Sequence, residues 1–523
     1  MNARVIAIVI TAALASLLEI IDSSIVNVAI PTMMGNIGAT LDEISWVTTG
    51  YMIANSIVLP IAAWLGTRLG RRQYFTGAIL LFTLASVACG MAPNLWALVV
   101  FRILQGLAGG ALLPTSQTLI QESFPPEKAG MAMAIFGLSV MVGPALGPTL
   151  GGYLTDSFGW RSIFNVNLPL GLLAAVMAWL NVQDVSPSKG AVLEEGKKNG
   201  VDWMGLGLLC LGVGCFQYIL ERGEADGWFE SQGISVCAIL AVVGITGFIY
   251  WELKVDNPIM NLRLFKHNIL RSGTMLMLAL GVMLFALTFA IPIFVSHVMP
   301  QMSATQTGKL FMPGALLTGC LMFPVGMLLQ VVNPKLLVLC GITLGELSIF
   351  AMTRLTTESG ANDILVPMMI RGCAMAFLFI PINQMVLGAL RGAELGQVAG
   401  MQNFFRQIGG SIGIASLDTL LTRFNAQNYN DILSEVNALN PIAFHDYHNT
   451  MGLPLTKFSS EIGLWSAQTI AVKSLAGRAW NQVFVLSFSQ LCWVISMIVA
   501  CGLIPLYLIR PKRKPGAPII DSH

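Results

Sequence analysis

Residues 143–152 read GPALGPTLGG and lie in the middle of an apolar stretch of the chain. Three glycines at four-residue spacing and two prolines interrupt this stretch: Gly143, Gly147, Gly151, Pro144 and Pro148. In a soluble helix each interior glycine costs about 1 kcal/mol relative to alanine, and each proline costs about 3 kcal/mol. The segment would therefore be a loop in water, and whether it is a helix depends on the solvent around it.

The composition indicates that this solvent is lipid. Of the 523 residues, 55% are hydrophobic and 11% are charged, whereas soluble domains carry roughly a quarter charged residues. The net charge of +2 is too small to indicate a nucleic-acid partner, and no basic arm is present in the sequence. All nine cysteines fall in apolar segments, so we expect them to be packing residues and not disulfide or metal ligands.

A helix needs about 20 mostly apolar residues to cross the hydrocarbon core of a bilayer. This criterion predicts fourteen spans, at about 5–27, 46–66, 74–92, 95–118, 131–153, 163–180, 203–221, 233–252, 270–294, 308–330, 336–353, 363–387, 397–420 and 480–509. The first span contains two acidic residues, and no small-residue cleavage site follows it. We therefore expect a retained span and no signal peptide.

The distribution of lysine and arginine predicts the orientation of these spans. An even number of spans places both termini on the same side. With the termini inside, the cytoplasmic segments hold 18 of the 29 basic residues, the outer segments hold 8, and three lie within spans: Arg102, Arg371 and Arg406. The sequence therefore predicts cytoplasmic N- and C-termini.

Two features indicate that the chain is divided into halves. Residues 181–202 form a polar, charged linker of the kind that separates domains. The fourth and twelfth predicted spans each carry an early arginine, a late proline and a glutamine three residues after the proline, Gln117 and Gln384. Parallel repeats of this sort build one large class of transporter.

The first and fourth spans carry ionisable residues, which cost at least about 2.5 kcal/mol each at membrane depth. Glu19 and Asp22 share one helix face, and Arg102 lies one turn before Gln105. A structural ion pair with a snorkelling group is one interpretation. The other is that Asp22 exchanges a proton under the influence of Arg102, because burial favours a neutral carboxyl group and a nearby cation favours a charged one. We favour the second interpretation for Asp22; Glu19 could instead contact substrate.

In the second half, Glu346 and Arg371 could form an equivalent pair, although a purely structural pair is an equal alternative. We expect Arg406 to anchor polar packing near the cytoplasmic side. Residues 445–448 read HDYH, but two histidines with no further ligand in register favour a solvated surface over a metal site.

Enzyme motifs are poorly supported. Residues 409–413, GGSIG, fit G-x-S-x-G but lie in an apolar helix without the preceding strand that this motif requires. The sequence contains neither H-E-x-x-H nor G-x-x-x-x-G-K-[ST]. We therefore expect no enzyme and no cofactor, and energy that comes from an ion gradient or from the gradient of the substrate itself.

Several motifs occur in a fixed order along the chain: IDSSIVNVAIP (21–31), R-x-x-Q-G (102–106), GPALGPTLGG (143–152), WRSIFNVNLPLG (160–171), NPIMNLRLFK (257–266), SATQTGKLFMPG (303–314) and FFRQIGGSIGIA (404–415). Together they resemble the 14-span drug:proton antiporters of the major facilitator superfamily, the EmrB/QacA type. A long last outer loop and the stretch GWFESQ (227–232) bring the chain closest to the EmrB-type inner-membrane subunits of tripartite exporters.

This resemblance implies an all-α membrane protein with the major facilitator fold, in which two extra central helices accompany two six-helix bundles. The implied divisions are an N-terminal bundle (1–180), the linker (181–202), the extra helices (203–252), a C-terminal bundle (253–510) with a long periplasmic loop (421–479), and a cytoplasmic tail (511–523). Because long structureless loops are uncommon, we expect the loop to be partly helical.

The resemblance also implies a function, which is proton-coupled multidrug export from the bacterial inner membrane by alternating access. The implied partners are hydrophobic or amphipathic small molecules, protons, lipid, a periplasmic membrane-fusion adaptor and an outer-membrane channel. Export of one natural product, such as a fatty acid or a siderophore, is the alternative within this fold. A third hypothesis is a docking platform in which loop 421–479 binds a partner and the bundle is passive.

The candidate site residues, taken from the intramembrane charges, from the internal repeat and from the resemblance, fall into three groups. Proton coupling is assigned to Asp22, Glu19 and Arg102. The substrate cavity and its support are assigned to Gln105, Gln117, Glu346, Arg371 and Gln384. Conformational gating is assigned to Gly143, Pro144, Gly147, Pro148, Gly151, Gly152, Arg68, Gly70 and Arg71.

Two of the gating motifs carry specific expectations. The loop motif G-x-L-x-D-R-x-G-R-R is incomplete, because Ala63 and Thr67 replace its glycine and aspartate, so a charge-pair gate there is in doubt. In lipid, glycines every four residues allow a neighbouring helix to pack closely, and prolines are tolerated. We expect this glycine stripe to lie against the opposite bundle near the central cavity, with plain helix packing as the alternative.

Overall fold

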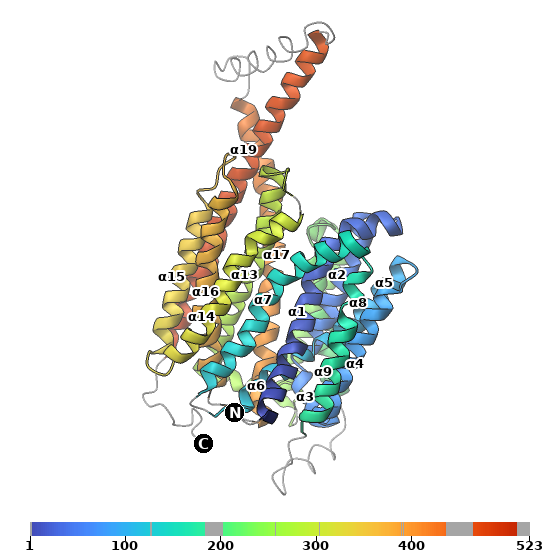
Figure 1. Ribbon diagram of the computed structural model, residues 1–523, viewed down its shortest axis with the longest axis vertical. Coiled ribbons are helices and arrows are strands. Elements are labelled where there is room, and N and C mark those ends of the chain that lie inside the picture. The colour runs from blue at the N-terminus through green and yellow to red at the C-terminus, as the bar shows by residue number, and fades with distance from the viewer. Residues whose placement is uncertain are drawn as a thin grey trace.

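The computed structural model describes residues 3–125, 128–183, 202–256, 258–302, 304–388, 390, 392–435 and 464–509. These residues form helices and no strand, which confirms the all-α prediction. The helices stand side by side in one long bundle (Figure 1). The two ends of the chain, marked N and C, both lie at its lower end in Figure 1, which agrees with an even number of crossings.

For description, we group the helices by their order in the chain into an N-terminal half, an extra pair and a C-terminal half. The N-terminal half comprises α1 (Ala3–Ile37), α2 (Leu41–Val58), α3 (Ala62–Leu69), α4 (Arg71–Gly90), α5 (Leu95–Gly109), α6 (Leu112–Glu122), α7 (Ala129–Phe158), α8 (Ser162–Asn165) and α9 (Asn167–Asn181). The extra pair is α11 (Trp203–Arg222) and α12 (Gln232–Lys254). The C-terminal half comprises α13 (Asn268–Val298), α14 (Ala304–Leu328), α15 (Pro334–Met352), α16 (Ala361–Leu387), α17 (Gly392–Glu435), α19 (Leu464–Cys501) and α20 (Leu503–Leu508).

Most of these helices meet the requirements for a membrane span. Within the described residues, twelve helices or nearly continuous helix pairs are long and apolar enough, and α7, bent by 42° after Pro144, would be a thirteenth. Helix α17 covers the predicted span 397–420 but is too polar to meet the criterion. The count of fourteen spans and the cytoplasmic side of the termini therefore stay predictions.

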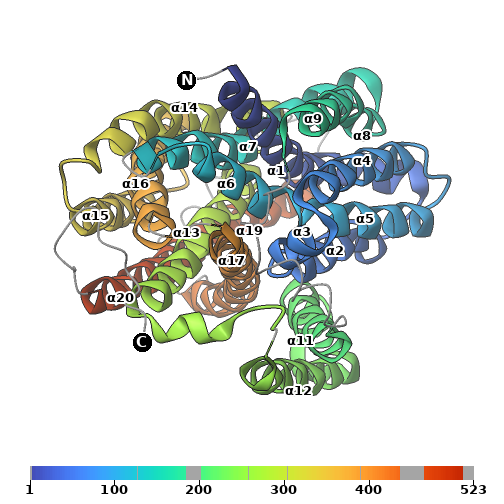
Figure 2. The same ribbon diagram turned by 90° about the horizontal axis from the view of Figure 1, so that it is seen from below.

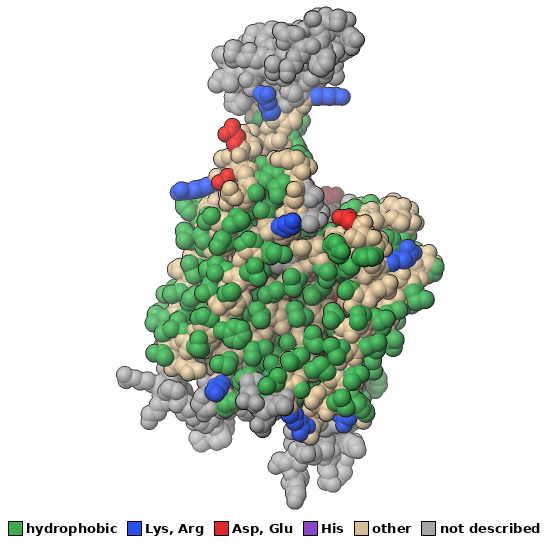
Figure 3. All heavy atoms as spheres, in the orientation of Figure 1, with side chains coloured by type: hydrophobic (Ala, Val, Ile, Leu, Met, Phe, Trp, Pro, Cys, Tyr) green, Lys and Arg blue, Asp and Glu red, His purple; other side chains and the backbone are tan. Residues whose placement is uncertain are grey.

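The surface agrees with a protein surrounded by lipid. Hydrophobic side chains cover the flank of the bundle, and the charged side chains that are visible lie near its two ends (Figure 3). Large apolar side chains are strongly exposed on several helices around the bundle, such as Leu84 on α4, Val243 on α12 and Leu347 on α15. Because exposed apolar side chains of this density would be costly in water, the flank is suited to hydrocarbon.

The extra pair is central in the sequence but peripheral in space. Seen from below, α11 and α12 lie outside the two halves (Figure 2). An apolar cluster joins Leu209 and Val213 of α11 to Ile61 of the N-terminal half and Met401 of α17. The pair therefore packs along the seam between the halves and contacts both of them.

Helices α17 and α19 project beyond the other helices at the upper end of the bundle (Figure 1). At 1.5 Å per residue, the 44 residues of α17 extend over about 66 Å, roughly twice the hydrocarbon thickness of a bilayer. Residues 421–435 and 464–479 of the predicted outer loop are therefore helical, as we expected. Its remaining part, the HDYH segment and the tail 511–523 lie outside the described residues.

Candidate functional site

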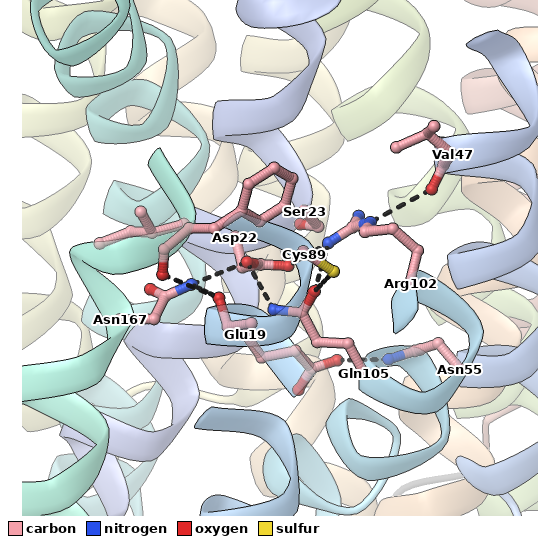
Figure 4. A network of polar contacts seen from close by, with 12 residues as sticks. Glu19, Asp22, Ser23, Val47, Asn55, Cys89, Arg102, Gln105 and Asn167 are labelled. Atoms are coloured by element: carbon pink, nitrogen blue, oxygen red, sulfur yellow. Dashed lines mark hydrogen bonds and ion pairs between the residues drawn. The ribbon is translucent and has the colours of Figure 1, made fainter. Parts of the chain in front are cut away.

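Asp22 lies on α1 at the centre of a buried polar network (Figure 4). Its Oδ2 accepts a hydrogen bond of 2.6 Å from the Arg102 guanidinium of α5. Its Oδ1 accepts bonds of 2.8 Å from the side-chain amides of Gln105 on α5 and Asn167 on α9. Asp22 is 0% exposed, so this carboxylate is fully enclosed by one cation and two neutral donors.

Arg102 is held from several sides, which explains how α5 can bury a guanidinium group. Besides Asp22, it donates to the Gln105 amide oxygen at 2.9 Å and to the Val47 carbonyl of α2 at 3.1 Å. The Tyr51 ring lies 4.1 Å from the guanidinium carbon, within the range of a cation–π interaction. The predicted association of Asp22, Arg102 and Gln105 is therefore present in the structure.

Glu19 lies one turn before Asp22 on the same face of α1, but it has a different set of partners. Its oxygens accept hydrogen bonds from the Asn55 side chain at 2.9 Å and from the Leu113 backbone N–H at 3.1 Å. Arg406, which lies on α17 in the other half, interacts with Glu19 electrostatically. Glu19 therefore borders the seam between the halves, whereas Asp22 lies inside the N-terminal half.

The predicted pair of Glu346 and Arg371 does not form, so this expectation is wrong. Arg371 of α16 donates to the Leu284 carbonyl at 2.8 Å and to the Thr288 hydroxyl of α13. Glu346 of α15 accepts a hydrogen bond from Ser496 of α19. Packing of α15 against α19 turns Glu346 to the outside of the half, while Arg371 points toward α13.

The other predicted cavity residues lie at the seam or close to it. Arg371 and Pro144 line the same small cavity of about 40 Å³ between α7 and the C-terminal half. Gln384 on α16 is half-buried, and its amide oxygen has no hydrogen-bond partner among the described residues. Neither Arg371 nor Gln384 contacts Asp22 or Glu19 through a described hydrogen bond, so both lie outside the polar network around α1.

Gln117 links the two halves through buried hydrogen bonds. Its amide donates to Asn383 of α16 at 2.7 Å, and its carbonyl oxygen accepts from Asn403 of α17 at 2.6 Å. Arg406 donates to Asn403 at 3.3 Å, which extends the link toward Glu19. Lower on the seam, Gly130 packs closely against Gly326. The halves are therefore closed against each other near the end that carries the termini.

Replacing Gln117 with leucine is expected to open this closed end. Asn383 and Asn403 would each lose a buried partner, at a cost of about 1–3 kcal/mol per group. Since about 1.4 kcal/mol is a factor of ten in an equilibrium, the closed population should fall about tenfold or more. Spin labels would be placed at Gln73 and Val331, which are both exposed near this end. The distance between the two labels, measured by electron paramagnetic resonance, would report the change.

Gln121 provides the control for this experiment, because it is equally buried on α6 but has no hydrogen-bond partner among the described residues. Gln121→Leu should leave the distance distribution unchanged. Exposed native cysteines would first be replaced with serine. An unchanged distribution in the Gln117→Leu variant would show that these hydrogen bonds do not hold the halves together.

The glycine stripe packs closely, but its partner differs from the one predicted. It faces α1 of its own half and not the opposite bundle. A methyl group added at Gly143, Gly147 or Gly151 would meet, in turn, Ile20, Ser24 or Ile25. Gly152 is buried, and Pro148 is half-buried. Asp22 lies between these contacts on α1 and Glu19 lies next to them, so the stripe packs on the stretch of α1 that carries the acidic residues.

The incomplete loop motif has a substitute charge pair. Gly70 joins α3 to α4 with a φ of 87°, in the left-handed region that favours glycine. Arg71 forms a two-point ion pair with Glu122 at the end of α6. Arg68 is exposed and lies over the Trp64 ring. Glu122 thus supplies the carboxylate that Thr67 lacks, although it pairs within the N-terminal half.

The uncharged partners of the site were not predicted from the sequence. These are Asn55, Asn167, Asn383 and Asn403. Asn167 lies inside the quoted motif WRSIFNVNLPLG, and Asn55 is a polar residue within an apolar span. An amide in an apolar run was a usable signal, since it needs a buried partner.

Comparisons with known proteins agree with this architecture. The Major Facilitator Superfamily profile matches residues 12–414. The multidrug export protein EmrB of Escherichia coli K12 is 31% identical over 517 residues, covering 98% of this chain and 97% of EmrB. The fatty acid resistance protein FarB of Neisseria gonorrhoeae is 29% identical over 504 residues, covering 96% of each.

Among solved structures, the proton:xylose symporter XylE superposes with a TM-score of 0.57 at 12% identity, and the alignment covers 95% of each chain. At that identity the likeness shows the fold alone. The family profile and the relatives extend through most of the sequence, as the ordered motifs predict. The chain therefore belongs to the major facilitator superfamily of membrane transporters, and its similarity to EmrB covers nearly its full length.

Proposed function

We propose that this protein exports hydrophobic and amphipathic small molecules across a bacterial inner membrane in exchange for protons. The similarity to EmrB supports multidrug export as the activity. The observation that carries proton coupling is the pair of buried carboxyl groups on α1, only one of which has an ion-pair partner among the described residues. Buried acidic residues at membrane depth commonly serve as proton sites.

The two carboxyl groups have different roles in this proposal. Arg102 neutralises the charge of Asp22, so a proton that binds Asp22 also changes the interaction between the two side chains. Glu19 is held by neutral donors, and its charge attracts Arg406 across the seam. A proton on Glu19 removes this attraction and favours separation of the halves at the closed end. Loss of the proton on the other side restores the closed arrangement, which couples proton movement to alternating access.

Transport by purified protein in vesicles with an imposed pH gradient tests this proposal. We expect dye efflux to follow the gradient in the wild-type protein and to fall at least tenfold in Glu19→Gln. The control is Glu252→Gln, since Glu252 is also a buried carboxyl group but lies on α12 and accepts from the Met260 backbone. Gradient-driven efflux that persists in Glu19→Gln would remove Glu19 from the coupling step.

A narrow exporter of one natural product is the second candidate, which the similarity to FarB favours. In this case the substrate would be a fatty acid or a siderophore. Substrate-stimulated proton movement, measured in the same vesicles across unrelated toxic compounds and long-chain fatty acids, separates the candidates. A response to many unrelated compounds supports multidrug export, and a response to one chemical class supports the narrow exporter.

We further propose that the pump works with a periplasmic adaptor and an outer-membrane channel. The projection of α17 and α19 beyond the bundle supports this proposal, because it provides a surface outside the membrane (Figure 1). Deleting residues 430–460 is expected to leave transport in vesicles within about twofold of wild type, since the residues that join the two halves by hydrogen bonds lie outside the deleted segment. The same deletion should abolish resistance in cells that carry the whole export system.

Growth in the presence of toxic compounds and vesicle transport would be measured on the same variant. Immunoblots would verify that the wild-type protein and the deletion variant reach comparable levels in the membrane. Loss of vesicle transport would contradict a pure docking role for this region, and retained resistance would contradict the tripartite assembly.

A further inference from the structure

A groove on the outer flank of the C-terminal half contains a carboxylate that the proposed transport mechanism does not use. It lies between α15 and α19 and has a volume of about 380 Å³. The residues that matter for its chemistry are Thr343, Glu346, Phe350, Thr353, Trp493 and Ser496. This volume falls within the range of about 300–1,000 Å³ that is typical of small-molecule sites.

The groove opens toward the lipid and not toward the seam. Helix α15 lies at the edge of the bundle, on the far side from the N-terminal half (Figure 2). Around the groove, Leu347 of α15 and Met497 of α19 are 52% and 64% exposed. Glu346 lies about 18 Å along α15 from Pro334 and about 9 Å from Met352, at 1.5 Å per residue. The carboxylate is therefore at hydrocarbon depth.

The hydrogen bonding of Glu346 is incomplete. Its Oε2 accepts from the Ser496 hydroxyl, while its buried Oε1 has no partner among the described residues. No lysine or arginine within the described part of the chain forms an ion pair with Glu346. An acidic side chain in the hydrocarbon region is costly without a partner, so the groove has an unmet requirement for a cation or a donor.

Aromatic rings line the same groove. Phe350 and Trp493 meet edge to face, with ring centroids 6.2 Å apart. Arg354, at the end of α15, lies over Phe350 at 4.7 Å, which leaves the Trp493 ring for a ligand. Trp is the best aromatic partner for an organic cation, and such contacts strengthen when water is excluded.

We propose that this groove is a binding site for amphipathic organic cations that arrive from the lipid. The positive centre pairs with the charge of Glu346, and an apolar substituent packs against Trp493. The site is separate from the seam, because Glu346 and its partner Ser496 both belong to the outer face of the C-terminal half. Binding here therefore does not depend on the Glu19 and Asp22 cluster.

Tetraphenylphosphonium and tetraphenylborate test this proposal, because they share one shape and carry opposite charges. Binding to the full chain would be measured by calorimetry in nanodiscs of phosphatidylglycerol, which has no cationic headgroup. The wild-type protein should show a tetraphenylphosphonium binding event that Glu346→Gln weakens at least tenfold. Ser496→Ala keeps the carboxylate and should change the affinity by less than threefold. Weak binding of tetraphenylborate should be the same in all three proteins.

Several outcomes would overturn the proposal. One is a tetraphenylphosphonium isotherm in Glu346→Gln that superposes on the wild-type isotherm. Another is an equal loss of affinity for both probes in Glu346→Gln, which would mean that the groove recognises only shape and apolar surface. A third is disappearance of the wild-type event when phosphatidylethanolamine is added, which would assign the site to a lipid ammonium group. Retained thermal stability of Glu346→Gln, measured in parallel, excludes unfolding as the cause of a loss.

Discussion

The double variant Asp22→Asn with Arg102→Met is expected to fold and insert but to lose proton-driven export. Removing one partner of a buried ion pair costs about 3–5 kcal/mol, whereas replacing both is often neutral. Arg102→Met alone leaves Asp22 charged and 0% exposed, so we expect low yield and a lowered unfolding temperature. The double variant restores stability but lacks the Asp22 carboxylate, and we expect that Glu19 alone does not sustain the coupling.

Unfolding temperature and gradient-driven efflux in vesicles would be measured on both single variants and on the double variant. The matched control is the Arg71 and Glu122 pair at the lower end of the bundle, whose side chains are 18% and 23% exposed. Partly exposed pairs contribute at most about 1 kcal/mol, so Arg71→Met should lower stability much less than Arg102→Met. Export by the double variant would show that the buried pair is only structural.

Gly147→Leu is expected to reduce transport to the background level. A Cβ atom at this position would overlap the Ser24 side chain and lie 3.2 Å from the Ile25 backbone nitrogen. A leucine needs still more space, and overpacking of this kind costs about 1–3 kcal/mol or more. The strain would push α1 away from α7 and displace Glu19 and Asp22, which lie on α1 beside this contact.

Gly77→Leu is the control for added volume, because Gly77 on α4 is exposed and nothing lies within 4 Å of its added Cβ. It should transport at the wild-type rate. The smaller change Gly147→Ala should impair transport in part, and Ser24→Gly in the same chain should restore it by making room. Rescue by Ser24→Gly identifies α1 as the partner of the stripe. Normal transport by Gly147→Leu would contradict the close contact altogether.

The sequence alone was sufficient to predict most helices and the buried ion pair between α1 and α5. A helix that crosses a bilayer must be apolar over the whole thickness of the hydrocarbon core, so the spans could be found by counting apolar residues. Ionisable groups in such spans are few, and for this reason Asp22 and Arg102 could be singled out 80 residues apart. The glycine stripe was recognised correctly as a close-packing surface because only small residues allow backbones to approach.

Only the tertiary structure determined which helix each of these residues contacts. Helix periodicity determines which residues share a face, but it does not determine which helix that face meets. The glycines therefore pack on α1, Glu346 binds Ser496 in place of Arg371, and Gln117 reaches Asn383 across 266 residues. These contacts depend on how distant helices cross, and the crossing is set by the packing of the whole bundle.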